Sequence, residues 1–171
     1  IDYKSGKRAF SLSDVYNGIQ LQLVTYLHAI LQNEEADSIQ GQLLPAGILY
    51  LPVDDPMIRL ASRESQEEVD KALMEALRMN GLILDDVDLV KEMDRDISGP
   101  SQIIPARLNK TGKLGVSSVA TIRQFRDLCK FTEKLLIQMG QEIMEGNASI
   151  NPYRQKKQTP CSYCAFKAVC Q

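Results

Sequence analysis

The sequence has no run of apolar residues long enough to span a bilayer, and no secretory signal peptide is visible in it. It also lacks internal repeats and low-complexity stretches. From these absences we expect a cytoplasmic location and no membrane partner. With 171 residues, of which 44% are hydrophobic and 25% charged, the chain can bury one sizeable core.

The sequence also lacks a net positive charge. The formal net charge is −2 and the pI is near 5.5, values unlike those of a freestanding DNA-binding module. Any contact with DNA must therefore be local, or be supplied by other parts of a larger protein. Histidine occurs only once, as His28, and we expect it on a helix surface.

An acid and a lysine separated by one residue, Asp2 and Lys4, lie on a predicted strand at residues 1–4. Successive side chains of a strand point to opposite faces, so these two project the same way. A carboxylate can hold a divalent metal while the neighbouring ammonium orients or activates water, as phosphodiester hydrolysis requires. The same pattern also fits an exposed ion pair at a strand end, so it needs support from elsewhere.

A helix predicted over residues 13–32 supplies that support. Gln22 and Tyr26 are four residues apart on it, so both side chains reach one surface. An amide and a phenol there can contact phosphate oxygens or steady Lys4. The alternative is a boundary glutamine beside a half-buried tyrosine.

Three of the four cysteines are gathered at the C-terminal end, as Cys161, Cys164 and Cys170. Two and then five residues separate them, a spacing that favours a metal centre, either zinc or an iron-sulfur cluster. Disulfides are disfavoured, because the chain has no secretory signal and is large enough not to need them. The remaining Cys129 falls on the apolar face of a predicted helix, so we interpret it as an inert core thiol.

Taken together, these motifs resemble the RecB-type nuclease domain of the PD-(D/E)xK superfamily. More narrowly, they are similar to the C-terminal part of the AddB-type subunits of AddAB helicase-nucleases. The resemblance runs over the whole chain and includes the linking segments 47–56 and 79–82. It implies a metal-dependent DNA exonuclease or endonuclease domain of an ATP-dependent helicase-nuclease that processes double-strand DNA ends for recombinational repair. The implied partners are DNA and an AddA-type subunit, joined in a heterodimer.

The resemblance also implies roles for individual residues. Asp2 would bind Mg²⁺, Lys4 would be the catalytic lysine, and Gln22 and Tyr26 would form the helical motif flanking the site. The implied role of the C-terminal cysteines is to provide three ligands of a [4Fe-4S] cluster, with the fourth outside this chain. These ligands are Cys161, Cys164 and Cys170.

Other parts of the family pattern are not present. An acidic residue on a preceding strand shares the metal in the family, and the first cluster cysteine comes from well upstream; His28 does not replace the family's earlier histidine. We therefore expect a fragment of a larger protein that is inactive by itself. Two alternatives remain open: a CRISPR-associated exonuclease of the same superfamily, or a DNA-binding scaffold with a dead site.

The order of predicted elements favours an α/β fold. We expect a restriction-endonuclease-like core, truncated at its N-terminal side, with a helical insertion at about 57–100. The nuclease domain spans 1–150, and an iron-sulfur-binding tail spans 151–171. Besides the helix over 13–32, helices are predicted at 65–79, 86–93 and 121–145, a strand at 43–53, and a hairpin of 103–108 with 114–119. Gly81 is interpreted as the residue that ends the helix over 65–79.

Three groups of charged residues invite interpretation. Arg154, Lys156 and Lys157 precede the cysteines and either meet DNA phosphates or form a solvated loop. Arg107 is interpreted as an ordinary turn charge, together with the lysines near it. An acidic set is expected to be a solvated face or a contact for the partner subunit; it comprises Asp85, Asp86, Asp88, Glu92, Asp94 and Asp96.

Overall fold

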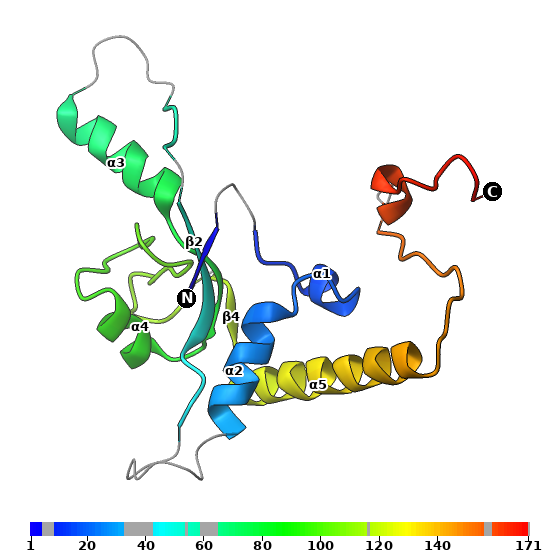
Figure 1. Cartoon of the computed structure of the whole chain (residues 1–171). Coiled ribbons are helices and arrows are strands. Elements are labelled where there is room, and N and C mark those ends of the chain that lie inside the picture. Colours follow the sequence, from blue (N-terminus) through cyan, green and yellow to red (C-terminus); the bar gives the residue numbers. More distant parts are fainter. Residues whose placement is uncertain are drawn as a thin grey trace.

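The computed structural model describes residues 1–4, 9–32, 43–53, 55–58, 65–115, 117–155 and 159–170, and for residues 2–4 it describes the backbone alone. The described helices and strands are, in chain order, β1 (Asp2–Lys4), α1 (Leu12–Tyr16), α2 (Gln22–Gln32), β2 (Gly47–Pro52), α3 (Gln66–Leu77), β3 (Asn80–Leu84), α4 (Val87–Met93), β4 (Val119–Ala120) and α5 (Ile122–Met144). A short 3-10 turn, Pro160–Tyr163, lies in the C-terminal tail, which extends away from the sheet (Figure 1).

The four described strands form one mixed sheet in the order β1-β2-β3-β4. β1 runs parallel to β2, β2 antiparallel to β3, and β3 parallel to β4. Asp2 is the register partner of Tyr50, and Tyr50 pairs in turn with Asn80, so these three residues form one row across the sheet. The predicted α/β class is confirmed.

Each face of the sheet carries its own core, because alternate residues of a strand point to opposite sides. Helices α2 and α5 cover one face, as Figure 1 shows. The core on this side contains Val15, Leu23, Val24, Ile48, Tyr50, Leu82, Leu84, Ala120, Phe125 and Cys129. Helix α4 and the loop that follows it cover the other face, with Leu49, Ile83, Val90, Ile104 and Ala106 buried. Each large side chain buried in this way stabilises the fold by about 1.5–3 kcal/mol.

The single helix predicted over 13–32 is wrong, because the structure has two helices there, α1 and α2. Gly18 lies between them with φ +77°, a left-handed conformation that interrupts the helix. Ser11 rather than Ser13 caps α1. The buried Gln20 amide then stabilises the connection, since its oxygen accepts from the Ser11 backbone N–H at 3.0 Å and its nitrogen donates to the Ala9 carbonyl at 3.0 Å.

The interpretation of Gly81 as a helix terminator is also wrong. Helix α3 ends at Leu77, and Gly81 lies inside β3, a strand that the sequence analysis did not predict. Strands β2 and β3 approach closely at Gly81, whose φ is +153°. A Cβ added there would overlap the Ile48 carbonyl oxygen and lie 2.9 Å from the Leu49 Cα. The segment 57–100 therefore contains two helices, as expected, together with a strand of the sheet.

The other predicted elements have mixed outcomes. The helices over 86–93 and 121–145 are confirmed as α4 and α5, and the helix over 65–79 as α3. The strand over 43–53 is confirmed but begins only at Gly47. The predicted hairpin is reduced to isolated bridges, including Leu108 with Leu114, and its second arm leads into β4, which pairs with β3. No described helix is long and apolar enough to cross a membrane.

Gly81→Ala is expected to lower the free energy of unfolding by at least about 2 kcal/mol, because the methyl group forces β2 and β3 apart. Equilibrium unfolding in urea, followed by circular dichroism, measures this change. Gly140 lies on the exposed part of α5, where an added Cβ meets nothing within 4 Å. Gly140→Ala should therefore stabilise the protein by about 0.5–1 kcal/mol. Equal stability of Gly81→Ala and the parent would contradict the close approach.

Candidate functional site

Strand β1, which carries Asp2 and Lys4, is confirmed as a strand at the edge of the described sheet. Its register places Asp2 beside Tyr50 and Lys4 beside Pro52 of β2. Tyr50 belongs to the core on the α2 and α5 side. The side chains of Asp2 and Lys4 lie outside the described part of the structure, so their roles remain predictions.

Gln22 and Tyr26 meet on the first turns of α2, as the sequence predicts. The Gln22 side-chain nitrogen donates to the Tyr26 hydroxyl at 3.0 Å. Tyr26 is 54% exposed, so the pair lies on the surface rather than in the core. Because the Tyr26 oxygen accepts in this bond, its own hydrogen remains able to donate to an oxyanion such as phosphate.

His28 has a structural position. Its Nε2 lies 3.7 Å from Glu133 Oε2, so the ring connects α2 to α5, and it is half-buried between them. A shallow pocket of about 220 Å³ lies next to it, lined in part by Arg126, Lys130 and Cys129. Within the described ranges, no three histidine, cysteine or acidic side chains are arranged to hold a metal ion.

Cys129 is buried in the core between α5 and the sheet, with 3% of its surface exposed. Burial raises the pKa of its thiol, so the nucleophilic thiolate is disfavoured. The interpretation of Cys129 as a core thiol is confirmed.

The tail cysteines lie around one pocket. Thr159 caps the turn Pro160–Tyr163 by accepting from the Cys161 backbone N–H at 3.4 Å. Cys161 is half-buried, whereas Cys164 and Cys170 are exposed. All three line a pocket of about 500 Å³, together with Phe166. Thiols are the donor type that an iron-sulfur cluster uses, but in the described part of the chain these three are not arranged to hold a metal ion.

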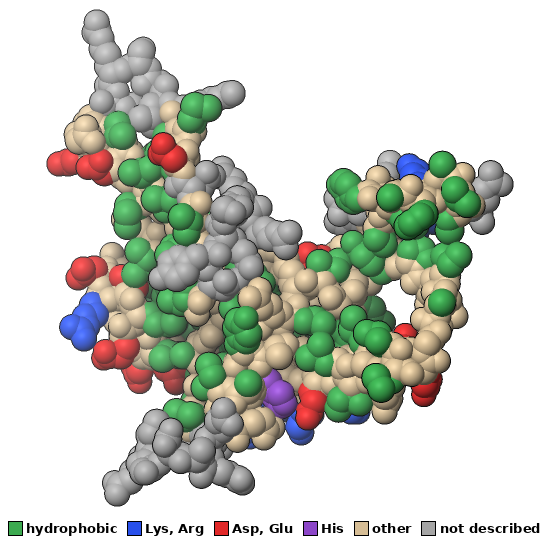
Figure 2. Space-filling view, viewed as in Figure 1, with side chains coloured by type: hydrophobic (Ala, Val, Ile, Leu, Met, Phe, Trp, Pro, Cys, Tyr) green, Lys and Arg blue, Asp and Glu red, His purple; other side chains and the backbone are tan. Residues whose placement is uncertain are grey.

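The basic residues that precede the tail cysteines are described only in part. Arg154 is exposed, while Lys156 and Lys157 lie outside the described residues. Nearby, Gln155 Nε2 donates to Ser13 Oγ at 2.7 Å and so joins the tail to α1. Figure 2 shows acidic side chains over the side that carries α3 and α4.

Most of the predicted acidic set is exposed, which fits both alternatives, a solvated face and a contact for a partner subunit. Two of its members also have structural roles: Asp86 caps α4 through backbone N–H groups, including that of Leu89 at 3.0 Å. Asp94 is half-buried and accepts from Ser101 Oγ at 2.6 Å. This arrangement does not make a metal site.

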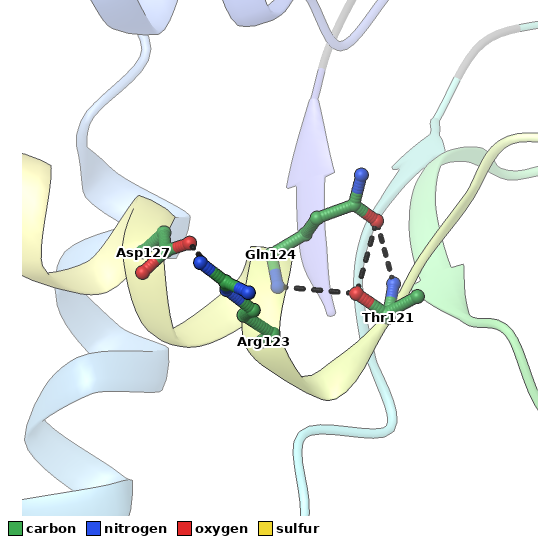
Figure 3. Close-up of polar contacts among 4 residues, drawn as sticks. All are labelled: Thr121, Arg123, Gln124 and Asp127. Carbon is green, nitrogen blue, oxygen red and sulfur yellow. Dashed lines mark hydrogen bonds and ion pairs between the residues drawn. The ribbon is translucent and has the colours of Figure 1, made fainter.

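The start of α5 is fixed by a reciprocal cap (Figure 3). Thr121 accepts from the Gln124 backbone N–H at 3.3 Å, and the Gln124 side-chain oxygen accepts from the Thr121 backbone N–H at 2.8 Å. Arg123 and Asp127 form an exposed ion pair one turn apart, at 3.8 Å. This cap joins β4 directly to α5 and so orients the helix that supports α2.

The sequence analysis missed a basic pocket formed by Arg78 and Arg107, which are 29 positions apart. Arg78 and Arg107 line the same surface pocket, at the end of the sheet where β3 and β4 begin. Nothing in the local pattern around either residue signals the pairing, since Arg107 looks like an ordinary turn charge.

Alkylation with iodoacetamide should distinguish the thiols in chelator-treated protein. Cys161, Cys164 and Cys170 are expected to react at mildly alkaline pH, and Cys129 only after denaturation, because burial keeps its thiol protonated. Peptide mapping by mass spectrometry gives the rate at each position. Modification of Cys129 in native protein as fast as that of Cys170 would show that the core is open there.

Comparison with known proteins gives a consistent result. A model of the PD-(D/E)XK nuclease superfamily matches residues 1–171. The chain is similar to proteins named as the B subunit of an ATP-dependent helicase/deoxyribonuclease: it is 53% identical to that of Acetivibrio thermocellus over 172 residues, and 51% identical to those of Ruminiclostridium cellulolyticum and Clostridium novyi over 172 and 171 residues. Each comparison covers 100% of this chain and 15% of the relative's length. The resemblance drawn from the motifs is confirmed.

Proposed function

This chain belongs to the PD-(D/E)XK nuclease superfamily, and on that premise we propose that it is the DNA-cutting domain of an ATP-dependent helicase-nuclease. One observation supports this most directly: Asp2 and Lys4 lie on β1, which pairs in parallel with β2 and brings Asp2 beside Tyr50, a residue of the core that α2 and α5 cover. Gln22 and Tyr26 lie on α2. Strand β1 and helix α2, which carry the residues of the family motif, thus both lie next to the core that contains Tyr50.

The family implies a divalent metal, and the donor chemistry fits. Asp2 is the carboxylate that would hold Mg²⁺, a cation that prefers oxygen ligands. Such an ion supplies Lewis-acid activation of water and offsets charge on the phosphate. Lys4 orients the attacking water or contacts the scissile phosphate, and the Tyr26 hydroxyl donates to a phosphate oxygen. The second carboxylate is expected outside this chain.

The tail is proposed to bind a [4Fe-4S] cluster. Cys161, Cys164 and Cys170 line one pocket without being arranged as a metal centre there, and it is their spacing in the sequence that supports their roles as three of the four ligands. The cluster would be structural. It would hold the tail against upstream sequence and so close the nuclease domain around the DNA strand. Three basic residues shortly before the cysteines would then be held together where they can contact DNA phosphates. They are Arg154, Lys156 and Lys157.

We propose DNA as the substrate and a helicase-nuclease subunit of the AddA type as the partner, in a heterodimer that processes double-strand ends for recombinational repair. The relatives' name, which marks them as B subunits, supports the existence of another subunit. Their similarity over the whole of this chain favours this function over that of a CRISPR-associated exonuclease. The presence of Asp2 and Lys4 favours a cutting domain over a dead scaffold.

Asp2→Asn or Lys4→Gln, made in the intact subunit, should reduce Mg²⁺-dependent cleavage of linear DNA by at least about 100-fold, because each removes a group that acts on the scissile phosphate or the attacking water. DNA binding should change by less than about twofold. Asp88→Asn is the matched control, since it removes an exposed carboxylate from α4, away from the site. Normal cleavage by Asp2→Asn would exclude the proposed metal ligand.

Loss of a cluster ligand should be visible directly. Cys161→Ala is expected to bleach the brown colour of the intact protein and to weaken binding to DNA ends, because the tail is no longer tied to upstream sequence. Cys129→Ala should keep the colour, since that thiol is buried in the core. Absorbance and iron content measure both variants. A colourless Cys129→Ala protein would make Cys129 a ligand and overturn the assignment.

A further inference from the structure

A pocket of about 390 Å³ opens at the end of the sheet where β3 and β4 begin. Two arginines, two serines and two prolines contribute to its lining. These residues are Arg78, Arg107, Ser117, Ser118, Pro100 and Pro105. None of the described residues that line this pocket is aromatic or carries a carboxylate.

The two arginines are positioned by separate segments. Arg78 follows α3, and its guanidinium donates to the Ser101 carbonyl at 3.4 Å, across a gap of 23 positions. Arg107 is fixed through its backbone: its N–H donates to Ser117 Oγ at 2.9 Å, and its carbonyl accepts from the Gly115 N–H at 2.8 Å. The fold thus brings two guanidinium groups to one site.

Neither charge is neutralised within the described part of the chain. The ion pairs that the structure records there join other residues, namely His28 with Glu133, Arg95 with Glu92, and Arg123 with Asp127. Both arginine side chains are exposed at the pocket. Guanidinium groups bind phosphate oxygens through charge-assisted, often bidentate hydrogen bonds, so an unpaired couple of them forms a site for a phosphate.

The register of the sheet relates this pocket to the nuclease motif. Asp2, Tyr50 and Asn80 form one row across the strands. Arg78 precedes Asn80 by two residues, at the end of the sheet toward which β1 runs from Asp2 to Lys4. Because neighbouring strands lie about 4.8 Å apart, the pocket at the starts of β3 and β4 lies roughly 10–15 Å across the sheet from β1.

We propose that the pocket of Arg78 and Arg107 binds a backbone phosphate of a nucleic-acid strand, a few nucleotides from the phosphate held at Asp2 and Lys4. The second half of this statement rests on the proposed function. A polymer with regularly spaced phosphates can reach both positions along one end of the sheet, which a single small anion cannot. The pocket offers no aromatic ring on which a base could stack, so the contact is independent of base sequence.

A charge-matched pair of variants tests this. Arg78→Gln/Arg107→Gln should weaken binding of a fluorescent single-stranded oligonucleotide by about tenfold at low salt and lower the slope of log K against log salt by about 1. Lys110→Gln/Lys113→Gln removes the same charge from the exposed turn nearby and should change affinity by less than about twofold. Fluorescence anisotropy of the whole chain in chelator measures binding without cleavage. Equal losses in both variants, or no loss in the arginine variant, would overturn the proposal.

Two further arms complete the experiment. Arg78→Lys/Arg107→Lys keeps the charge and the packing but removes the planar fork, so it should lose affinity by about threefold; unchanged affinity would exclude a bidentate phosphate contact. Inorganic phosphate should compete only weakly, whereas competition as strong as that of the oligonucleotide would indicate a free-phosphate site instead. The cleavage assay of Asp2→Asn tests the nuclease assignment separately. If that assignment fails, Arg78→Gln/Arg107→Gln should still lose more affinity than Lys110→Gln/Lys113→Gln, so the two proposals can fail independently.

Discussion

The antiparallel pairing of β2 with β3 is the contact on which the rest of the structure depends. β2 holds β1 on its other side, and β3 holds β4, so this pairing connects the strand of the nuclease motif to the strand that leads into α5. Where the backbones approach most closely, Gly81 leaves room for the Ile48 carbonyl. Residues of both strands also separate the two cores, with Tyr50 and Leu82 on one face and Ile83 on the other.

Helices α2 and α5 pack on the sheet and position the polar residues of the candidate site. Helix α2 presents Gln22 and Tyr26 outward, while Leu23 and Val24 of the same turns are buried against the sheet. Its angle is set by α5 through packing and through the contact of His28 with Glu133. The polar pair of Gln22 and Tyr26 on the surface is therefore held in place by apolar residues of the same helical turns. Its geometry follows from the core rather than from the hydrogen bond between the two polar side chains.

The sequence predicted what local patterns determine. Helices α3 and α5 have an apolar stripe and a capping box, so their starts were predictable. The break at Gly18 was missed because apolar positions continue in helical register beyond it. Strand β3 was missed because three apolar residues after a glycine also fit a helix end. The pairing of Arg78 with Arg107 depends on the assembled sheet, which no local pattern encodes.

Helix α5 is packed along only part of its length. Its buried residues, Phe125, Cys129 and Thr132, all fall in the first half of its 23 residues, and the remainder is exposed. A helix of that length is about 34 Å long, so a tilt of about 10° around its packed start moves the far end by about 6 Å. The sheet and the cysteine tail are therefore connected by a helix whose second half contains no buried residue, so a small tilt at its packed start would shift the tail relative to the sheet.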